Sequence, residues 1–397
     1  MTSKENKPPL TPETTFCPNI DCPARGQVGE GNIGVHSQKD RRYICRKCNR
    51  SFSATTGTLF YRLRKGADLI TLVVKLLSHG CPIHAIVFAF GLDERTVRNW
   101  FEKSGQHLQR VHEHLVEQPR PLGQVQCDEL RIKIQGAIIW MGMAIMVQNR
   151  LWLGGEISAS RDSKFIEKLI TRVKRCASAL GGAILFCVDG LPSYPKAIWK
   201  TFREKEPRDE PGRCRMIEWP KILIAQVIKQ YENNRVSGVR REVYQGTQEA
   251  VAEVIKQTQG KGSINTAFIE RINGTFRSCL HSLARRTRSL ARQSQTLQSG
   301  MYLVGCVYNF CTEHKSLRMP GLTGGHKWLE RTPAMASGIT DHCWAVDELL
   351  SYKAPPPRWE PKRSLSQRHP WWEPKRPRGR PRKSPQPEIG GGASDHG

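Results

Sequence analysis

The stretch QVQCDELRIKIQGAIIWMGMAIMVQNRLWLGGEI, residues 124–157, decides the fold of this chain. After Pro119 and Pro121 the apolar residues recur at every second position, a period that is typical of β-strands. The pattern predicts strands over residues 124–134, 137–147 and 151–157. Because the turns between them are short, neighbouring strands should be antiparallel.

The next segments extend this sheet. Residues 162–179 have the apolar spacing of a helix, with one buried face made of Phe165, Ile166, Leu169, Ile170 and Val173. Residues 183–188 form a short apolar run, which favours a strand that is buried on both faces. Three antiparallel strands, a helix, another strand and later helices are the order of a ribonuclease-H-like α/β core. We expect this core to span residues 122–320, with a C-terminal segment at 321–352.

Two neighbouring acids lie in the first predicted strand. Alternation places Asp128 on the face of Leu130, Ile132 and Ile134, whereas Glu129 shares its face with Arg131 and Lys133. Asp128 is therefore expected to be the inward acid. A carboxylate on an apolar face costs free energy unless it is paired or binds a metal, so its position indicates a function.

Two further acids complete the candidate site. Asp189 ends the apolar run 184–188, at the carboxyl end of a strand, where sites in α/β sheets form; an ordinary Asp-Gly turn is the alternative. Glu270 lies on a predicted helix whose buried stripe contains Ile269, Ile272, Phe276, Leu280 and Leu283. The neighbouring ridge of Glu270, Asn273, Arg277 and His281 can line a cleft, although a surface Glu–Arg pair is the alternative.

These three acids suit metal-dependent phosphodiester chemistry. That chemistry uses two Mg²⁺ (or Mn²⁺) ions held by several carboxylates from different elements. We therefore expect Asp128, Asp189 and Glu270 to be catalytic, metal-binding residues.

The charge of the chain favours a nucleic acid partner. Its 397 residues carry 62 Lys and Arg against 36 Asp and Glu, a formal net charge of +26, and 38% are hydrophobic, enough for two or three domains. Six Arg and no acid lie from Arg271 to Arg292, so we expect Arg277, Arg285 and Arg286 to contact DNA. The N-terminus lacks the apolar core of a signal peptide, and no stretch approaches the roughly 20 apolar residues of a transmembrane helix. We expect a cytoplasmic, nucleoid-associated protein without a membrane partner.

Four cysteines near the N-terminus have the spacing of a zinc site. Cys17 and Cys22 form one pair and Cys45 and Cys48 the other, which predicts a zinc ribbon over residues 10–58 with a structural Zn²⁺ ion. Two unrelated pairs or a redox site remain alternatives. The total of thirteen cysteines is odd and mostly unpaired in spacing, so a secreted disulfide framework is not expected.

Residues 64–118 have helical periodicity with a tight break. A helix over 83–90 ends at Gly91, and Asp93 can cap the next helix, which buries Val97, Trp100 and Phe101. This arrangement predicts a helix-turn-helix whose second helix lies in the major groove, with a plain helical hairpin as the alternative. Its expected DNA contacts are Arg95, Arg98, Asn99 and Lys103.

Past Tyr352 the composition shifts to Pro, Arg and Trp, so residues 353–397 are predicted to be a disordered basic tail. The segment PRGRPRK, residues 377–383, contains Arg378, Gly379, Arg380 and Pro381. This core resembles an AT-hook, in which Arg378 and Arg380 would enter a narrow minor groove. A generic basic tail is the alternative.

Two motifs carry a family resemblance: RRYICRKCNRSFSATTGT at residues 41–58 and IERINGTFRSCLHSLARRT at residues 269–287. With the three acids and the predicted helix-turn-helix, the chain resembles the DDE transposases of the insertion-sequence-one family of small bacterial insertion sequences. The resemblance implies that Asp128, Asp189 and Glu270 bind the catalytic metals and that Arg277 is the basic residue after the Glu. The tail after Tyr352 goes beyond this family pattern.

The same resemblance implies a reaction and partners. Strand cleavage at element ends and strand transfer into target DNA would both be in-line phosphoryl transfers without a covalent protein intermediate. The partners would be double-stranded DNA, as terminal inverted repeats and as target, and a second copy of the chain, because two ends must be paired. Two alternatives remain: a DNA-binding protein without catalysis, which would be a decayed transposase or a regulator, and a structure-selective nuclease.

Overall fold

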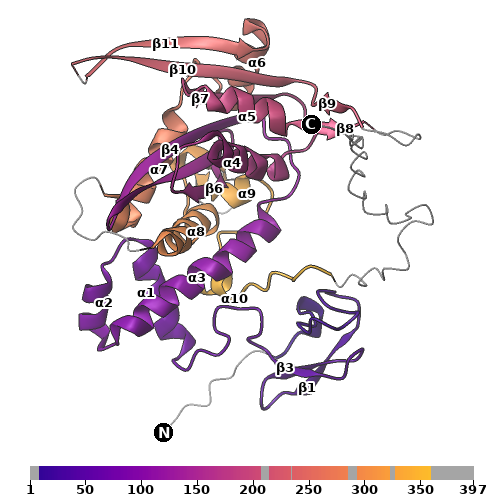
Figure 1. Ribbon diagram of the computed structural model, residues 1–397. Coiled ribbons are helices and arrows are strands. Elements are labelled where there is room, and N and C mark those ends of the chain that lie inside the picture. The colour runs from indigo at the N-terminus through magenta and orange to yellow at the C-terminus, as the bar shows by residue number, and fades with distance from the viewer. Residues whose placement is uncertain (1–8, 207–213, 234, 285–292, 322–326, 359–397) are drawn as a thin grey trace, which may run out of the picture.

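A computed structural model describes residues 9–206, 214–233, 235–284, 293–321 and 327–358 (Figure 1). Our predictions for Arg285, Arg286, Arg378 and Arg380, and for most of the tail, lie outside these residues. None of the described helices is both long enough and apolar enough to cross a membrane.

The centre of the molecule is a six-stranded mixed sheet with the order β11-β10-β7-β4-β5-β6. The predicted antiparallel strands are confirmed as β4 (Gln124–Ile134), β5 (Ala137–Met146) and β6 (Leu151–Ser158). The predicted buried strand is β7 (Ile184–Asp189), which pairs in parallel with β4. On its other side β7 pairs in parallel with β10 (Ile222–Glu232), and β11 (Arg235–Gln245) returns antiparallel to form the edge.

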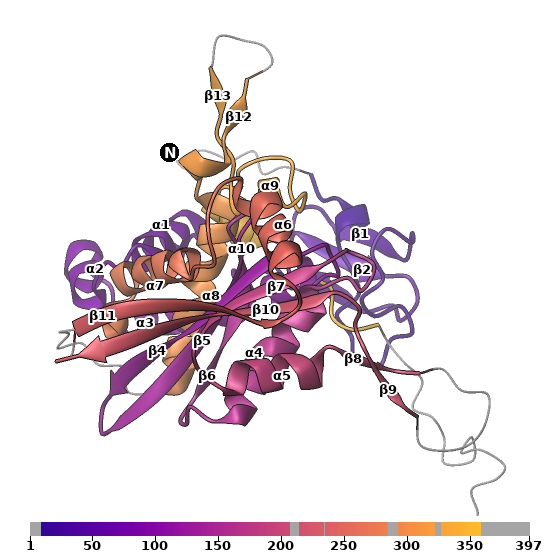
Figure 2. The same cartoon turned by 90° about the horizontal axis from the view of Figure 1, so that it is seen from above.

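Helices cover both faces of this sheet, as Figure 2 shows. On one face lie α4 (Ser163–Cys176) and α5 (Ser193–Thr201), and on the other α6 (Gln248–Gln259) and α7 (Ala267–Cys279). The predicted apolar face of α4 is buried, and the Asp162 carboxylate caps this helix by accepting a hydrogen bond of 2.8 Å from the Phe165 amide. The long helix α8 (Ser294–Cys311) packs against β6 and α3.

The N-terminal part precedes the sheet in the chain. Three short antiparallel strands, β1 (Ile33–Ser37), β2 (Arg42–Cys45) and β3 (Ser51–Ser53), are followed by α1 (Ala67–Ser78), α2 (Ile83–Phe90) and α3 (Glu94–Leu115). As expected, α2 ends at Gly91, which has a φ of 60°, and Asp93 caps α3 through the Thr96 amide at 3.1 Å. Val97 and Trp100 are buried, and Phe101 is half-buried.

The remaining elements are short. They are η1 (Pro12–Thr14), β8 (Arg203–Lys205), β9 (Met216–Glu218), η2 (His281–Leu283), η3 (Lys315–Leu317), β12 (Met319–Pro320), β13 (Trp328–Leu329), α9 (Pro333–Ala336) and α10 (Val346–Ser351). Because α7 ends at Cys279, His281 lies in the 3-10 turn η2 and does not continue the helical ridge that we predicted.

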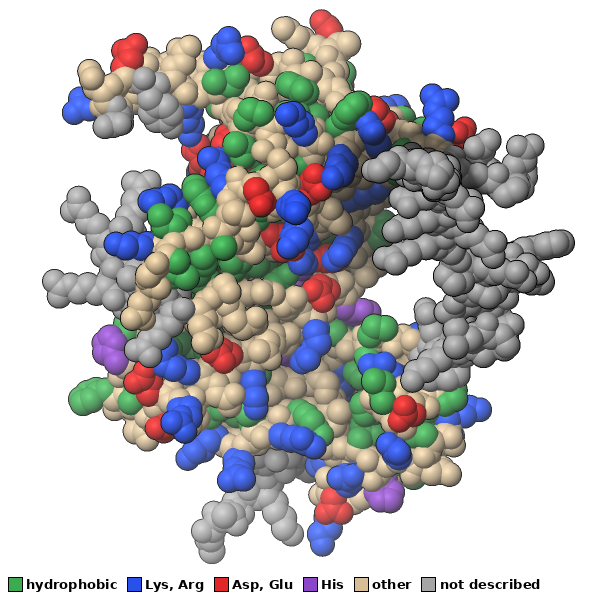
Figure 3. All heavy atoms as spheres, in the orientation of Figure 1, with side chains coloured by type: hydrophobic (Ala, Val, Ile, Leu, Met, Phe, Trp, Pro, Cys, Tyr) green, Lys and Arg blue, Asp and Glu red, His purple; other side chains and the backbone are tan. Residues whose placement is uncertain are grey.

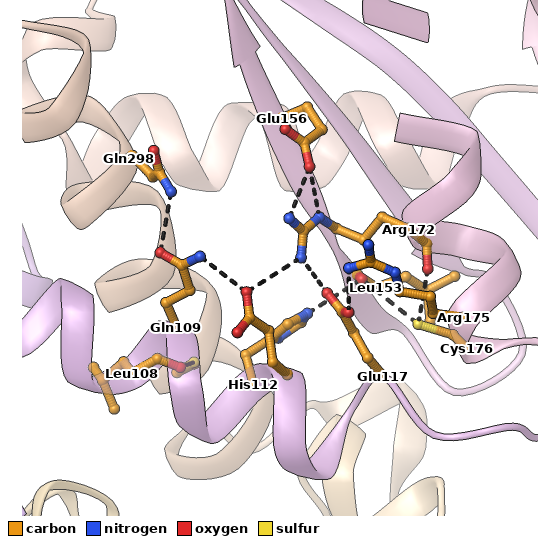
Figure 4. A network of polar contacts seen from close by, with 12 residues as sticks. Leu108, Gln109, His112, Glu117, Leu153, Glu156, Arg172, Arg175, Cys176 and Gln298 are labelled. Atoms are coloured by element: carbon orange, nitrogen blue, oxygen red, sulfur yellow. Dashed lines mark hydrogen bonds and ion pairs between the residues drawn. The ribbon is translucent and has the colours of Figure 1, made fainter. Parts of the chain in front are cut away.

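A buried polar network joins the second half of α3 to the sheet (Figure 4). The guanidinium of Arg172, on α4, pairs with Glu117 just after α3 and with Glu156 on β6. Gln109 on α3 donates to Glu113 at 2.9 Å and accepts from Gln298 of α8 at 3.0 Å. These contacts hold α3 against three elements, so its orientation relative to the sheet is well defined.

Residues 353–358, which we predicted to belong to the disordered tail, lie against the cysteine-containing N-terminal part. Lys353 donates to Thr15 at 3.1 Å and lies over the ring of Tyr43, and Arg358 pairs with Glu30 at 3.2 Å. The predicted tail therefore begins at least six residues too early.

Candidate active site and cysteine site

The first two predicted acids meet at one edge of the sheet. Gln126 of β4 pairs with Cys187 of β7, and two residues further along these parallel strands lie Asp128 and Asp189. Both side chains therefore point to the face that α6 and α7 cover. Asp128, Glu129 and Asp189 each offer one carboxylate oxygen that lies within 4.8 Å of the other two.

Asp128 is held by α7. Its Oδ2 atom accepts a hydrogen bond of 2.8 Å from Asn273, and its Oδ1 atom accepts one of 2.9 Å from the backbone amide of Glu129. Burial, together with the negative charges of Glu129, Asp189 and Glu270, raises the pKa of Asp128 to about 7. The Oδ1 atom of Asn273 is buried and makes no hydrogen bond with any described residue. Carboxylate and amide oxygens are ligands that Mg²⁺ prefers, so the residues here fit a divalent cation.

Our expectation for Glu129 was wrong. Its strand face is open to solvent at Arg131 and Lys133, as predicted, but at Glu129 the side chain has no exposed surface. The reason is that helices cover both faces of the central strands, so alternation does not separate an inward acid from an outward one here. Burial raises the pKa of Glu129.

Arg161, which the sequence did not point to, balances these acids. Its guanidinium donates two hydrogen bonds, of 3.0 and 2.7 Å, to Glu129 and one of 3.2 Å to Asp189. It also lies over the ring of Trp140, with its central carbon 5.1 Å from the ring centre. Arg161 therefore fixes Glu129 and Asp189 relative to each other.

Glu270 lies in the first turn of α7, close enough for its charge to raise the pKa of Asp128. It does not belong to the group of three oxygens within 4.8 Å. Its Oε1 atom accepts hydrogen bonds from Lys229 of β10 at 2.7 Å and from Thr266 at 3.1 Å. The structure thus brings the third predicted acid to the edge of the cluster, where Lys229 holds it.

The predicted DNA contacts of α3 lie near its first turns. Arg95, Arg98 and Asn99 are exposed, and Arg98 pairs with Glu94 of the same helix, whereas Lys103 is half-buried. Arg277 is half-buried in the last turn of α7. Figure 3 shows Lys and Arg side chains over much of one face of the molecule, including the part that α1, α2 and α3 form.

The four predicted cysteines come together and could hold a zinc ion. The sulfur atoms of Cys17 and Cys48 are 3.7 Å apart, and those of Cys22 and Cys45 are 3.8 Å apart. Ligands at about 2.3 Å in a tetrahedron around Zn²⁺ are about 3.8 Å from one another, so the donor atoms fit this ion without rearrangement.

Comparisons with known proteins give a distant likeness to solved structures and no match in sequence. No protein-family model matches the chain, and no curated protein matches it. Among solved structures, the chain is similar to a piggyBac transposase in a synaptic complex with hairpin DNA. The sequence identity is 9% and the TM-score is 0.31, and the match covers 64% of this chain and 66% of that chain.

Proposed function

We propose that this chain is a DDE transposase that cuts DNA at the ends of a mobile element and joins those ends to target DNA. The observation that carries the proposal is the meeting of Asp128 and Asp189 within 4.8 Å, with Glu270 near enough to raise the pKa of Asp128. Acids from two parallel strands and a helix on the same face are what metal-dependent phosphoryl transfer needs. In this proposal the sheet and its helices form a ribonuclease-H-like catalytic core.

Each residue of the site has a part in the proposed reaction. Asp128 and Asp189 would hold Mg²⁺ or Mn²⁺, and such ions supply an activated water and stabilise the leaving oxygen. Asn273 orients the Asp128 carboxylate, and Arg161 balances the charge of Glu129 and Asp189. Glu270 would complete the ligand set if its carboxylate left the ion pair with Lys229 and bound the metal instead.

The other parts of the chain would bind DNA. The pair α2 and α3 would act as a helix-turn-helix that recognises terminal inverted repeats, through Arg95, Arg98 and Asn99. The cysteine site would be a structural zinc ribbon, and two copies of the chain would pair two element ends. Arg277 would contact a phosphate next to the acids.

Activity on DNA tests the proposal. Wild-type protein with Mg²⁺ should nick a supercoiled plasmid that carries the element ends and should join a pre-cut end to target DNA. Asp128→Asn, Asp189→Asn and Glu270→Gln should each abolish both reactions and leave end binding intact. Glu249→Gln, at an exposed acid on α6, is the matched control and should remain active. Retained joining in the Asp128 variant would refute the assignment.

A second candidate is a DNA-binding protein without catalysis, and the pairing of Glu270 with Lys229 favours it. In that case the wild-type protein binds the ends but never nicks, and Lys229→Ala does not restore nicking. A structure-selective nuclease would nick but not join.

A further inference from the structure

A groove runs along β11 on the α6 and α7 face of the sheet. Its cavity has a volume of about 1060 Å³. The lining residues come from β11, from α6 and from the loop that follows α6, and they include Arg241, Tyr244, Ile255, Lys256 and Lys261. The function proposed above gives this groove no role.

One lining residue of the groove, Arg241, lies in the same cross-strand row of the sheet as Asp189. Arg241 pairs across the sheet with Val227 of β10, and Val227 pairs with Asp189 of β7. Side chains of directly paired residues point to the same face, and neighbouring strands are about 4.8 Å apart. Arg241 and Asp189 thus lie on one face with their backbones about 10 Å apart, so a strand of DNA held at the acids would reach the groove within a few nucleotides.

The lining has the chemistry of a site for an unpaired nucleic acid strand. The lining includes three cations, Arg241, Lys256 and Lys261, and one acid, Glu242, whose carboxylate pairs with Arg240 at 2.9 Å. The side chain of Tyr244 is exposed beside them, with a relative exposure of 60% for the residue. A basic groove with an exposed aromatic ring is the usual arrangement for single strands, because the ring stacks on any base while the cations meet phosphates.

The loop beyond α6 leaves room for a phosphate. Gly260 and Gly262 both have positive φ, at 74° and 154°, and flank the exposed Lys261. No described atom outside the chain neighbours lies within 4 Å of a Cβ added at Gly260, so a ligand can approach the main chain closely there, whereas at Gly262 the Oε1 atom of Gln259 lies 3.0 Å from an added Cβ.

We propose that this groove binds a single DNA strand, in which a base stacks on Tyr244 and phosphates pair with Arg241, Lys256 and Lys261. The cavity, at about 1060 Å³, is slightly larger than typical ligand pockets of about 300–1,000 Å³, so it suits a few nucleotides of one strand rather than a duplex. The statement that the bound strand is one that leaves the cleavage site rests on the proposed function. Binding itself does not.

Fluorescence anisotropy with a labelled 12-nucleotide oligo-dT and a labelled duplex, both in EDTA, tests the proposal. Tyr244→Ala should weaken oligo-dT binding about tenfold, and Tyr244→Ala with Lys256→Ala and Lys261→Ala should weaken it further. Tyr244→Phe should bind like wild type because its ring still stacks. The duplex affinity should change less than about twofold, since other parts of the chain hold it.

The control removes two exposed lysines from the opposite face of the sheet, Lys164→Ala with Lys168→Ala on α4, and should not change oligo-dT binding. An unchanged affinity in the triple variant, or an equal loss for duplex and single strand, would overturn the proposal. Because the measurement uses no metal and the Asp128→Asn variant should bind oligo-dT normally, loss of the proposed catalysis and loss of the groove site are distinguishable.

Discussion

Removing the guanidinium at position 172 should destabilise the protein strongly. The Arg172 side chain is 10% exposed and pairs with Glu117, which is 5% exposed, and with Glu156, which is 23% exposed. Arg172→Met keeps most of the volume but leaves two carboxylates with little access to water. Breaking a buried pair in this way costs about 3–5 kcal/mol. We expect the lower end, about 3 kcal/mol, because Arg175 still pairs with Glu117 at 3.2 Å.

Urea unfolding followed by circular dichroism measures this loss. Lys200→Met is the control, because Lys200 and its partner Glu167 are 67% and 31% exposed, and exposed pairs contribute about 0–1 kcal/mol. Adding Glu117→Gln and Glu156→Gln to Arg172→Met should recover most of the stability, since no uncompensated charge remains buried. If Arg172→Met unfolds at the same urea concentration as the control, the network in Figure 4 does not hold α3 in place as we infer.

Three other outcomes are expected. Cys22→Ser, or a zinc chelator, should unfold residues 10–58 and spare the central sheet, because a zinc ion bound by the four thiolates would stabilise this small segment in place of a larger core. Hydrogen exchange measures the protection of both regions, and loss of protection in the central sheet as well would show that the prediction is wrong. Gly274→Ala should raise stability by about 1 kcal/mol in a thermal melt, since no described atom outside the chain neighbours and the adjacent backbone of α7 lies within 4 Å of the added methyl group. The same variant should cut DNA more slowly if DNA approaches this turn of α7, and a lower melting temperature would contradict the prediction. Burial lowers the pKa of Lys353 from 10.5 to about 8. Docking of residues 353–358 should therefore be constant below pH 8 and strengthen between pH 8 and 10.5, where only the undocked lysine holds its proton. The anisotropy of a fluorophore attached at Ala354→Cys should rise over this range, and a fall would count against the prediction.

The local parts of this fold could be predicted from the sequence. Alternation located β4, β5 and β6, and an Asp before an apolar helical pattern located the cap of α3. These features depend on neighbours in the chain, so a window of ten to twenty residues contains the information that determines them.

Two of the features that were missed depend on distant contacts, and a third had a local signal. Glu129 is buried because helices cover both faces of β4, and the strand itself carries no sign of the second layer. The pairing of Lys229 with Glu270 joins residues 41 positions apart. The strands β10 and β11 had a usable signal, an apolar run at residues 222–228 and a turn at Asn233, whose φ is positive at 49°, but it was not recognised.

Helix α3 has one end exposed and the other fixed in the protein interior. Its 22 residues rise about 33 Å at 1.5 Å each, close to the length of one turn of B-DNA, about 34 Å. Because contacts fix its buried end, in the proposed function this helix would set the distance between the bases that its exposed end contacts and the phosphate that is cleaved beside the acids. The protein would then set the number of base pairs between those two points. Inserting half a turn of DNA between the recognised bases and the cleavage site would carry the phosphate to the far side of the duplex.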